Sequence, residues 1–482
     1  MSRLDQIRNE RLKKVERLRQ LGIDPFPSFC CKKMDVAEAR KKMNQEVEVV
    51  GRIFSLRGHG KLVFADLRDE SGQIQLMLKA DELKDEFKLV GLLDLGDFVL
   101  AKGQVTKTEK GEISVLVKEL RLLSKSIRPL PEKRQGLKDV EERYRQRYVD
   151  LLVNEEVKQV FMARTKIINL IRKFLDNQGF IEVETPVLQP LYGGATAKPF
   201  TTHYNALDSD FYLRIADELY LKRLVVGGFE KVYEMSKDFR NEGFSRAHNP
   251  EFTMLEFYWA YADYHKLIEF TEELLVFVIK NIQSNLRVNY QGTDYDFQPP
   301  WERITYKELF VEYLKIDIDK LNNEDKLITE VKNKDLLTNE TLIGYGQILD
   351  KLYKRHIRPK LKGPMFIMDR PYELLPLAKR KVEDQSKVGT FQLLVAGEEF
   401  INAYDELNDP QDQKSRWQED MNLGKQGADE YQVLDEDYIR ALEYGMPPTA
   451  GWGMGVDRLI AFLTNQTTLK DVILFPTLKP EV

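Results

Sequence analysis

One stretch of the sequence, residues 239 to 261, places many charged side chains beside an apolar segment; it reads FRNEGFSRAHNPEFTMLEFYWAY. From Phe252 onward its residues alternate with a period of two, a pattern typical of a β-strand. One face of that strand carries Glu256 between a methionine and a tyrosine. The loop before the strand is crowded with Arg240, Glu242, Arg246 and His248. A buried charge costs several kcal/mol unless it has a partner, so these side chains need each other or a ligand.

Charged and polar residues also interrupt other apolar segments of the chain. They are Glu218 in RIADELYLKRL, Glu399, Asn402 and Glu406 in GEEFINAYDELND, and Arg458 in GMGVDR. Carboxylates together with two arginines, Arg240 and Arg458, indicate a zwitterionic ligand bound beside a polyphosphate. The sequence contains no HExxH pair, no P-loop motif and no GxSxG motif, so zinc peptidases, P-loop NTPases and α/β-hydrolases are not indicated.

The composition describes a globular protein with more than one domain. The chain has 482 residues, of which 42% are hydrophobic and 31% are charged, and chains of this length divide into domains. No apolar run reaches the roughly 18 residues that a membrane helix needs, and the charged N-terminus lacks the apolar core of a signal peptide. The cysteines are adjacent and cannot form a disulfide framework. We therefore expect a cytoplasmic protein without a membrane segment.

Charge is distributed unevenly along the chain. Residues 1–145 carry 31 Lys and Arg against 24 Asp and Glu, whereas the remainder carries 42 against 54. A basic first third on an acidic body indicates that the N-terminal part binds a polyanion. Ordinary variation of surface charge explains the same numbers equally well, so charge alone leaves both interpretations open.

The N-terminal pattern predicts a helix followed by a small barrel. Residues 1–46 form an extension whose leucine and isoleucine spacing indicates an amphipathic helix. Five short strand candidates follow within 47–125, as in closed barrels of the oligonucleotide-binding (OB) type. Such barrels bind single strands through aromatic platforms and a basic groove, for which the candidates are Arg57, Phe64 and Gln75. A lone phenylalanine in a strand is more often a core residue, so this pattern leaves the role of Phe64 open.

The longer C-terminal part is expected to be an α+β domain. A linker at 126–150, rich in charge and containing proline, leads into it. From 151 to 482, strands and helices are grouped rather than alternating, which favours an antiparallel sheet over a doubly wound parallel one. The range near 262–390 is mostly helical in pattern and indicates an insertion between two strand-rich halves.

Five segments resemble the class II lysyl-tRNA synthetases of bacterial type, and together they extend along essentially the whole chain. GFIEVETPVL resembles the first class II motif and contains its proline, Pro186. Residues 239–265 resemble the second motif in its lysyl form, and GMPPTAGWGMGVDRLIAFL resembles the third. Residues 191–234 and the segment NAYDELNDPQDQ resemble the lysine enzyme within the class. All five occur in the family's order and spacing.

The resemblance implies lysine–tRNA ligation. Enzymes of this family activate L-lysine with ATP to lysyl-adenylate, release pyrophosphate, and transfer lysine to the 3′ end of tRNA(Lys). The resemblance also implies a class II catalytic domain with an antiparallel sheet, preceded by a barrel that binds the anticodon through Arg57, Phe64 and Gln75. It further implies a homodimer formed through the first motif around Pro186.

For ATP, the resemblance assigns Arg240, Glu242, His248, Asn249, Phe252, Glu399, Gly455 and Arg458. The catalytic pair is Arg240 and Arg458: Arg240 would bridge the lysine carboxylate and the α-phosphate, and Arg458 with His248 would hold the γ-phosphate. Phe252 would stack on adenine. A planar guanidinium suits the bridging role because it can bind two anions while charge builds between them. The attacking carboxylate is already ionised at pH 7, so activation needs no general base.

For lysine, the resemblance assigns Gly194, Glu218, Arg240, Glu256, Tyr258, Asn402, Tyr404 and Glu406. Glu406 and Tyr258 would bind the side-chain ammonium, and Glu218 with the backbone of Gly194 would bind the α-ammonium. A desolvated carboxylate rejects uncharged analogues strongly, because its charge would stay buried and unpaired. For Tyr404 an ordinary core position on the alternating INAYDEL segment remains the alternative.

One expected metal ligand departs from the family pattern. Lysine enzymes hold Mg²⁺, up to three ions together with ATP, through two glutamates spaced seven residues apart. Glu399 matches the second glutamate, but the first position is occupied by Gln392. An amide oxygen can bind Mg²⁺ without contributing charge, so we expect the shared metal site to be weaker than usual but present.

Several related classes compete with this assignment. Aspartyl and asparaginyl enzymes share the barrel and all three motifs, but an aspartate pocket needs a cation where Glu406 lies. A paralogue that attaches lysine to a translation factor lacks the predicted barrel. EMSKD at 234–238 resembles a class I KMSKS loop, yet no histidine lies in the HxGH motif that accompanies such loops. A non-catalytic RNA-binding relative is disfavoured by the presence of Arg240, Glu256 and Arg458.

Overall fold

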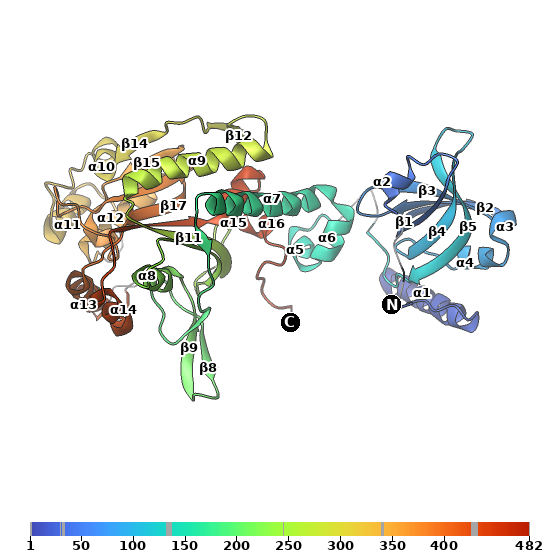
Figure 1. Ribbon diagram of the computed structural model, residues 1–482, viewed down its shortest axis with the longest axis horizontal. Coiled ribbons are helices and arrows are strands. Elements are labelled where there is room, and N and C mark those ends of the chain that lie inside the picture. The colour runs from blue at the N-terminus through green and yellow to red at the C-terminus, as the bar shows by residue number, and fades with distance from the viewer. Residues whose placement is uncertain are drawn as a thin grey trace. The chain divides into compact units, whose positions relative to one another are not determined.

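Two units make up the chain, Met1–Lys138 and Asp139–Val482 (Figure 1). The computed structural model describes residues 2–28, 30, 34–131, 137–243, 245–338, 342–425 and 432–481, with only the backbone of residue 59. Cys31, one of the two adjacent cysteines, lies outside these residues. None of the helices in the described ranges is both long enough and apolar enough to cross a membrane.

Five strands of the first unit close into a barrel, in the order β1-β2-β3-β5-β4. Their bounds are β1 Glu46–His59, β2 Leu62–Arg68, β3 Gln73–Lys79, β4 Phe98–Lys107 and β5 Ile113–Ser124. Alternate residues face inward, and Ala65, Leu67, Ile74 and Leu76 are completely buried. Strands β3 and β5 pair in parallel, and the other neighbours pair antiparallel. The five-stranded barrel expected from the sequence is confirmed.

Helices accompany this barrel; they are α1 Arg3–Gln20, α2 Val36–Ala39, α3 Ala80–Leu83 and α4 Phe87–Val90. Helix α1 begins with a capping box between Ser2 and Asp5, in which each side chain accepts a hydrogen bond from the other residue's backbone N–H. The C-terminal end of β5 is held by Lys125, whose buried Nζ lies 2.7 Å from Asp97 and 2.6 Å from Asp94. The helical N-terminal extension and the closed barrel therefore share one unit.

An eight-stranded sheet forms the centre of the second unit, in the order β14-β15-β16-β17-β18-β11-β10-β6. The strands are β6 Ile181–Glu182, β10 Lys231–Phe239, β11 Glu251–Ala260, β14 Glu302–Thr305, β15 Met365–Met368, β16 Thr390–Val395, β17 Glu398–Asp405 and β18 Thr449–Gly455. From β15 to β10 all neighbours pair antiparallel, and only the pairs at the two edges, β14 with β15 and β10 with β6, are parallel. The antiparallel sheet of the expected α+β class is confirmed.

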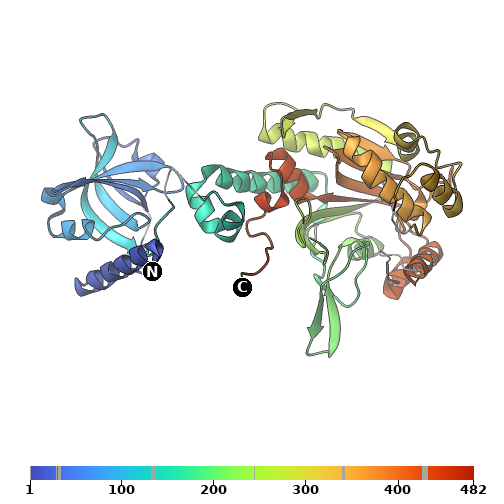
Figure 2. The ribbon, with the colours of Figure 1, turned by 180° about the vertical axis from the view of Figure 1, so that it is seen from behind.

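Helices cover both faces of the sheet (Figures 1 and 2). One face packs against α7 Glu155–Asn177, α9 Tyr264–Ile282 and α15 Val456–Leu463, in a core that includes the stacked rings of Phe257 and Trp452. The other face packs against α8 Glu218–Val226, α13 Pro410–Lys425 and α14 Glu436–Glu443, in a core that includes Val232 and Tyr258. Because side chains alternate along β11, Glu256 and Tyr258 lie on the second face and Phe257 on the first.

The remaining elements of the second unit lie around this layered core. They are α5 Val140–Arg145, α6 Arg147–Val153, the three-stranded sheet of β7 Leu188–Gln189, β9 Ser209–Leu213 and β8 Thr201–Tyr204, the hairpin of β12 Arg287–Tyr290 and β13 Thr293–Asp296, α10 Tyr306–Leu314, α11 Glu324–Asn333, α12 Tyr345–Leu352 and α16 Leu469–Val472. Helices α5 and α6 begin within the stretch expected as a linker. The range 262–390, expected as a helical insertion, contains α9 to α12 and also supplies β14 and β15 to the central sheet.

Candidate active site

A glycine-rich strand opens the second face of the sheet. In β18, Gly451 lies opposite Tyr258 of β11 and Tyr404 of β17, and Gly453 lies opposite Glu256 and Asn402. A side chain at Gly451 would collide with the Glu406 carboxylate and would come within 2.7 Å of the Tyr258 ring. The alternating glycines therefore leave a trough in the sheet, and the side chains of β11 and β17 form its walls.

A cavity of about 460 Å³ lies over this trough. Its lining includes every residue predicted to bind ATP, namely Arg240, Glu242, His248, Asn249, Phe252, Glu399, Gly455 and Arg458. It also includes every residue predicted to bind lysine, namely Gly194, Glu218, Glu256, Tyr258, Asn402, Tyr404 and Glu406 together with Arg240. Residues from segments more than 250 positions apart in the sequence thus share one hollow. Their individual roles remain predictions.

The acidic end of the cavity already holds one ammonium group of the protein itself. The Nζ of Lys222, completely buried, lies 2.5 Å from Glu218 Oε1 and also contacts a carboxylate oxygen of Glu406. The hydroxyl of Tyr404 donates to the same Glu218 oxygen at 2.7 Å. Burial alone lowers the pKa of Lys222, but the charges of Glu218 and Glu406 outweigh burial and raise that pKa above its usual range. Lys222 therefore remains an ammonium that neutralises part of this acidic wall.

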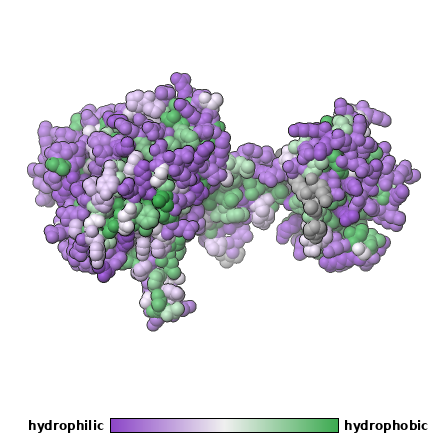
Figure 3. Space-filling model, in the orientation of Figure 1, coloured by the Kyte–Doolittle hydropathy of each residue, from purple (hydrophilic) through white to green (hydrophobic). Residues whose placement is uncertain are grey.

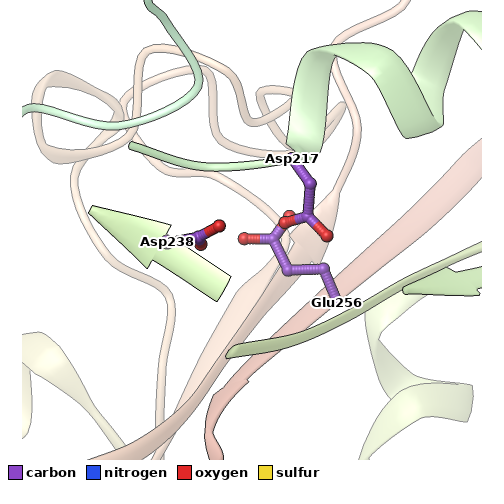
Figure 4. A group of neighbouring side chains, drawn as sticks. All are labelled: Asp217, Asp238 and Glu256. Carbon is purple, nitrogen blue, oxygen red and sulfur yellow. The ribbon is translucent and has the colours of Figure 1, made fainter. Parts of the chain in front are cut away.

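A second acidic group lies beside the first. Glu256 receives a hydrogen bond of 3.2 Å from the hydroxyl of Tyr258, and on its other side it faces Asp217 and Asp238 (Figure 4). Burial, then the charge of Glu218, raises the pKa of Glu256 to about 8. Burial likewise raises the pKa of Asp238 to about 6, against the opposing effect of Arg214. The protein thus holds these carboxylates where their charged forms are unfavourable without a positive partner.

The cavity lining also contains cationic side chains. The Arg240 guanidinium donates hydrogen bonds of 3.4 Å to the carbonyl of Ile215 and lies 5.1 Å from the centre of the Phe252 ring. Arg458 donates from Nη1 to the backbone carbonyl of Glu399 at 2.9 Å. Partial burial and the nearby Arg458 lower the pKa of His248, so its imidazole is neutral at pH 7. Two cations and a neutral hydrogen-bonding ring suit the charge and oxygen atoms of a polyphosphate.

The predicted metal pair has a different arrangement from the one expected. Glu399 lines the cavity, whereas Gln392 is buried behind it. The Gln392 amide nitrogen donates to the Glu399 carboxylate, and its oxygen accepts a hydrogen bond of 2.6 Å from the Tyr353 hydroxyl. In this geometry Glu399 fits as a ligand for a metal on the phosphates, and Gln392 fits as the group that orients Glu399. The side-chain oxygen of Gln392 would have to leave the Tyr353 hydroxyl before it could point into the cavity.

The predicted anticodon residues share one outward face of the barrel in the first unit. Arg57 lies directly opposite Phe64 across β1 and β2. Asp66, two residues after Phe64 and therefore on the same face, lies opposite Gln75 across β2 and β3. The Arg57 guanidinium is mostly exposed and binds Asp66 at 3.0 Å. Phe64 is only partly buried, and the inward positions beside it are filled by other residues, so a place in the barrel core is not its structural role.

Further residues that were not predicted from the sequence shape the acidic end. Lys222 was not singled out, although it follows Glu218 by four positions on a helix, the spacing of a helical ion pair. Asp217 lies in the same apolar segment as Glu218, so the signal that indicated Glu218 also applied to it. Asp238 follows Ser236 and Lys237 and precedes Arg240, so its sequence neighbourhood carried no such signal.

Comparison with known proteins agrees with this geometry. Residues 139–479 match the family model described as tRNA synthetases class II (D, K and N), and residues 47–123 match the OB-fold nucleic acid binding domain. The chain is 46% identical over 482 residues to a lysine–tRNA ligase of Carboxydothermus hydrogenoformans, covering 99% of both chains. It is 48% identical to the corresponding ligases of Pelotomaculum thermopropionicum, with 99% of this chain and 96% of the relative covered, and of Clostridium novyi, with 98% and 94% covered. The chain therefore belongs to the class II tRNA synthetases of the D, K and N group and, within that group, to the family of these lysine–tRNA ligases.

Proposed function

We propose that the protein is a lysine–tRNA ligase, which forms lysyl-adenylate from L-lysine and ATP, releases pyrophosphate, and transfers lysine to the 3′ end of tRNA(Lys). The observation that carries this proposal is one cavity whose lining combines buried carboxylates with two arginines. One ligand with two ammonium groups and a second ligand with phosphates match those two sets of side chains. We further propose that the protein acts in the cytoplasm, where both substrates are present.

In this proposal the first step depends on positioning and on charge. The lysine carboxylate attacks the α-phosphate, forms a carboxyl–phosphate bond and displaces pyrophosphate, and it needs no proton to be removed first. Arg240 is suited to lie between the two reacting groups, because it reaches Ile215 beside the lysine-binding segment and also the Phe252 ring. Fixed guanidinium charge at that point stabilises the charge that develops in the transition state. Phe252 would stack on adenine, while Arg458 and His248 would hold the terminal phosphate.

Selection for lysine would come from the acidic end. Lys222 brings one positive charge to two carboxylates, Glu218 and Glu406. One added ammonium group would balance the negative charge that remains. Tyr258 and Tyr404 enclose this place with their rings, whose centres lie 5.8 and 5.7 Å from Lys222 Nζ. An aspartate or asparagine side chain would leave the surplus carboxylate charge buried and unpaired.

Magnesium would join the ATP end of the cavity. Glu399 would hold it, Gln392 would orient Glu399, and the ion, when bound, would neutralise charge on the phosphates. The barrel would bind tRNA through the face that carries Arg57, Phe64 and Gln75, where an exposed base could stack on Phe64.

Pyrophosphate exchange tests the proposed reaction. Incubated with ATP, Mg²⁺ and labelled pyrophosphate, the protein should incorporate label into ATP with L-lysine and, at similar concentrations, with no other standard amino acid. The measurement covers all twenty amino acids, and an active-site variant, Arg240→Ala, serves as the negative control. Exchange with aspartate or asparagine in place of lysine would contradict the proposal.

Gln392→Glu should lower the Mg²⁺ concentration that supports half-maximal exchange, by roughly tenfold, because a second carboxylate beside Glu399 adds a charged ligand. Gln392→Met, similar in volume but without a ligand oxygen, should not lower it. An unchanged Mg²⁺ requirement in Gln392→Glu would show that position 392 does not limit the metal site.

Phe64→Ala should raise the KM for tRNA(Lys) in aminoacylation roughly 5- to 150-fold, the equivalent of one lost base stack of about 1–3 kcal/mol, and should leave lysine-dependent exchange unchanged. Phe98→Ala, which removes an exposed phenylalanine from another strand of the barrel, is the matched control. Equal effects of the two substitutions on the KM for tRNA would remove Phe64 from the proposed site.

We also propose a homodimer through the first class II motif. Large apolar side chains are exposed along it and on the helix before it: Met162 is 56% exposed, Ile181 52% and Leu188 41%. Figure 3 shows apolar surface over α6 and α7. Light scattering after size exclusion should give the mass of a dimer at micromolar concentration. Ile181→Lys should shift it toward the monomer, and a wild-type protein that is monomeric under these conditions would contradict the dimer.

A further inference from the structure

Three buried carboxylates meet beside the acidic end of the cavity (Figure 4). Asp217 lies at the start of α8, Asp238 on β10 and Glu256 on β11. One oxygen of each lies within 4.8 Å of the other two. Within the described ranges of the chain, no other group of three or more histidine, cysteine or acidic residues meets this condition. Of these three carboxylates, only Glu256 lines the cavity, so the cluster extends from the cavity wall into the protein.

Three of the six carboxylate oxygens in this cluster lack a hydrogen-bond partner. Asp217 is completely buried and neither of its carboxylate oxygens has a donor, and the same holds for Asp238 Oδ2. Asp217 occupies the N-cap position of α8, where an aspartate normally accepts a backbone N–H, yet it makes no such bond and is directed at Glu256 instead. Buried carboxylate oxygens without donors are costly, so three carboxylates that face one another favour a positively charged ligand between them.

Two cationic side chains nearby are already engaged. Arg214 bridges Asp238, at 3.2 Å, and Glu234, at 2.6 Å. Lys222 is held by Glu218 and Glu406. Burial, and then the charges of Glu256, Asp238 and Glu234, raise the pKa of Asp217 well above its usual range, and the charge of Arg214 opposes this rise only in part.

The geometry matches a metal ion better than an organic cation. Hard divalent ions bind carboxylate oxygens at about 2.0–2.6 Å, so two oxygens on one ion are at most about 5 Å apart, as they are in this cluster. We propose that Asp217, Asp238 and Glu256 bind one hard divalent cation, of the Mg²⁺ or Ca²⁺ type, at a site independent of the ATP phosphates.

Such an ion would also balance the charge of the acidic end. Six buried carboxylates, Asp217, Glu218, Glu234, Asp238, Glu256 and Glu406, face three cationic side chains, Arg214, Lys222 and Arg240. A divalent ion and a bound lysine with its net single positive charge would together make up the difference. This charge balance rests on the proposed function, whereas the three-carboxylate site itself does not.

Titration with Mn²⁺, followed through the electron paramagnetic resonance signal of the free ion, tests the site in the full-length protein without ATP or lysine. The wild type should bind one Mn²⁺ per chain with a Kd below about 1 mM. Asp217→Asn, nearly identical in shape, should weaken this binding at least about tenfold, as should Asp238→Asn. Glu399→Gln, which removes the proposed ligand on the ATP side, is the matched control and should bind as the wild type does.

Two results would overturn the proposal: no Mn²⁺ bound by the wild type, or equal binding by the wild type and Asp217→Asn. Thermal unfolding of each variant with and without Ca²⁺ gives a second readout. The wild type should gain stability from Ca²⁺ and Asp217→Asn should gain little. If Asp217→Asn were more stable than the wild type under all conditions, and Ca²⁺ stabilised neither protein, the proposal would also be overturned. The cluster would then be one whose carboxyl groups are kept neutral by protons. Absence of lysine-dependent exchange would refute the proposed function and leave the Mn²⁺ result standing.

Discussion

Buried carboxylates that need positive partners are the constraint on which the structure of the second unit depends. Glu218, Glu256 and Glu406 are all nearly inaccessible to water, and the protein provides one ammonium, from Lys222, for two of them. Removing carboxylates from water costs several kcal/mol each, and a partner of the right charge recovers much of it. The carboxylates thus carry unbalanced negative charge before any ligand binds. A ligand with an ammonium group would gain affinity by neutralising that charge.

The sheet makes this arrangement possible through register. Strand β18 places glycines opposite Glu256 and Tyr258, so the walls of the trough come from β11 and β17 and the floor is bare backbone. On the reverse face, Trp452 of the same strand stacks on Phe257 and belongs to the core. One strand with alternating glycine and bulky residues thus serves the cavity on one side and stability on the other.

The sequence was sufficient for elements with a clear local pattern. Alternation predicted β11 with Glu256 and Tyr258 on a common face, and the spacing of short strands predicted the barrel that carries Phe64. It was insufficient where the outcome depends on pairing between distant segments. The contact of Lys222 with Glu406 joins residues far apart in the chain, and the orientation of Gln392 depends on Tyr353 of a segment remote from its own strand. Such partners are determined by tertiary packing, which local sequence periodicity does not predict.

Calorimetric comparison of L-lysine with L-norleucine tests most directly whether surplus buried carboxylate charge selects the ligand. Norleucine has the same carbon chain and the same α-amino and carboxyl groups, and it lacks only the side-chain ammonium. We expect norleucine to bind at least about a thousandfold more weakly than lysine, because the carboxylates would stay desolvated and unpaired. Affinities for lysine and norleucine that differ by less than about tenfold would contradict selection by charge. The acidic end would then recognise its ligand by shape.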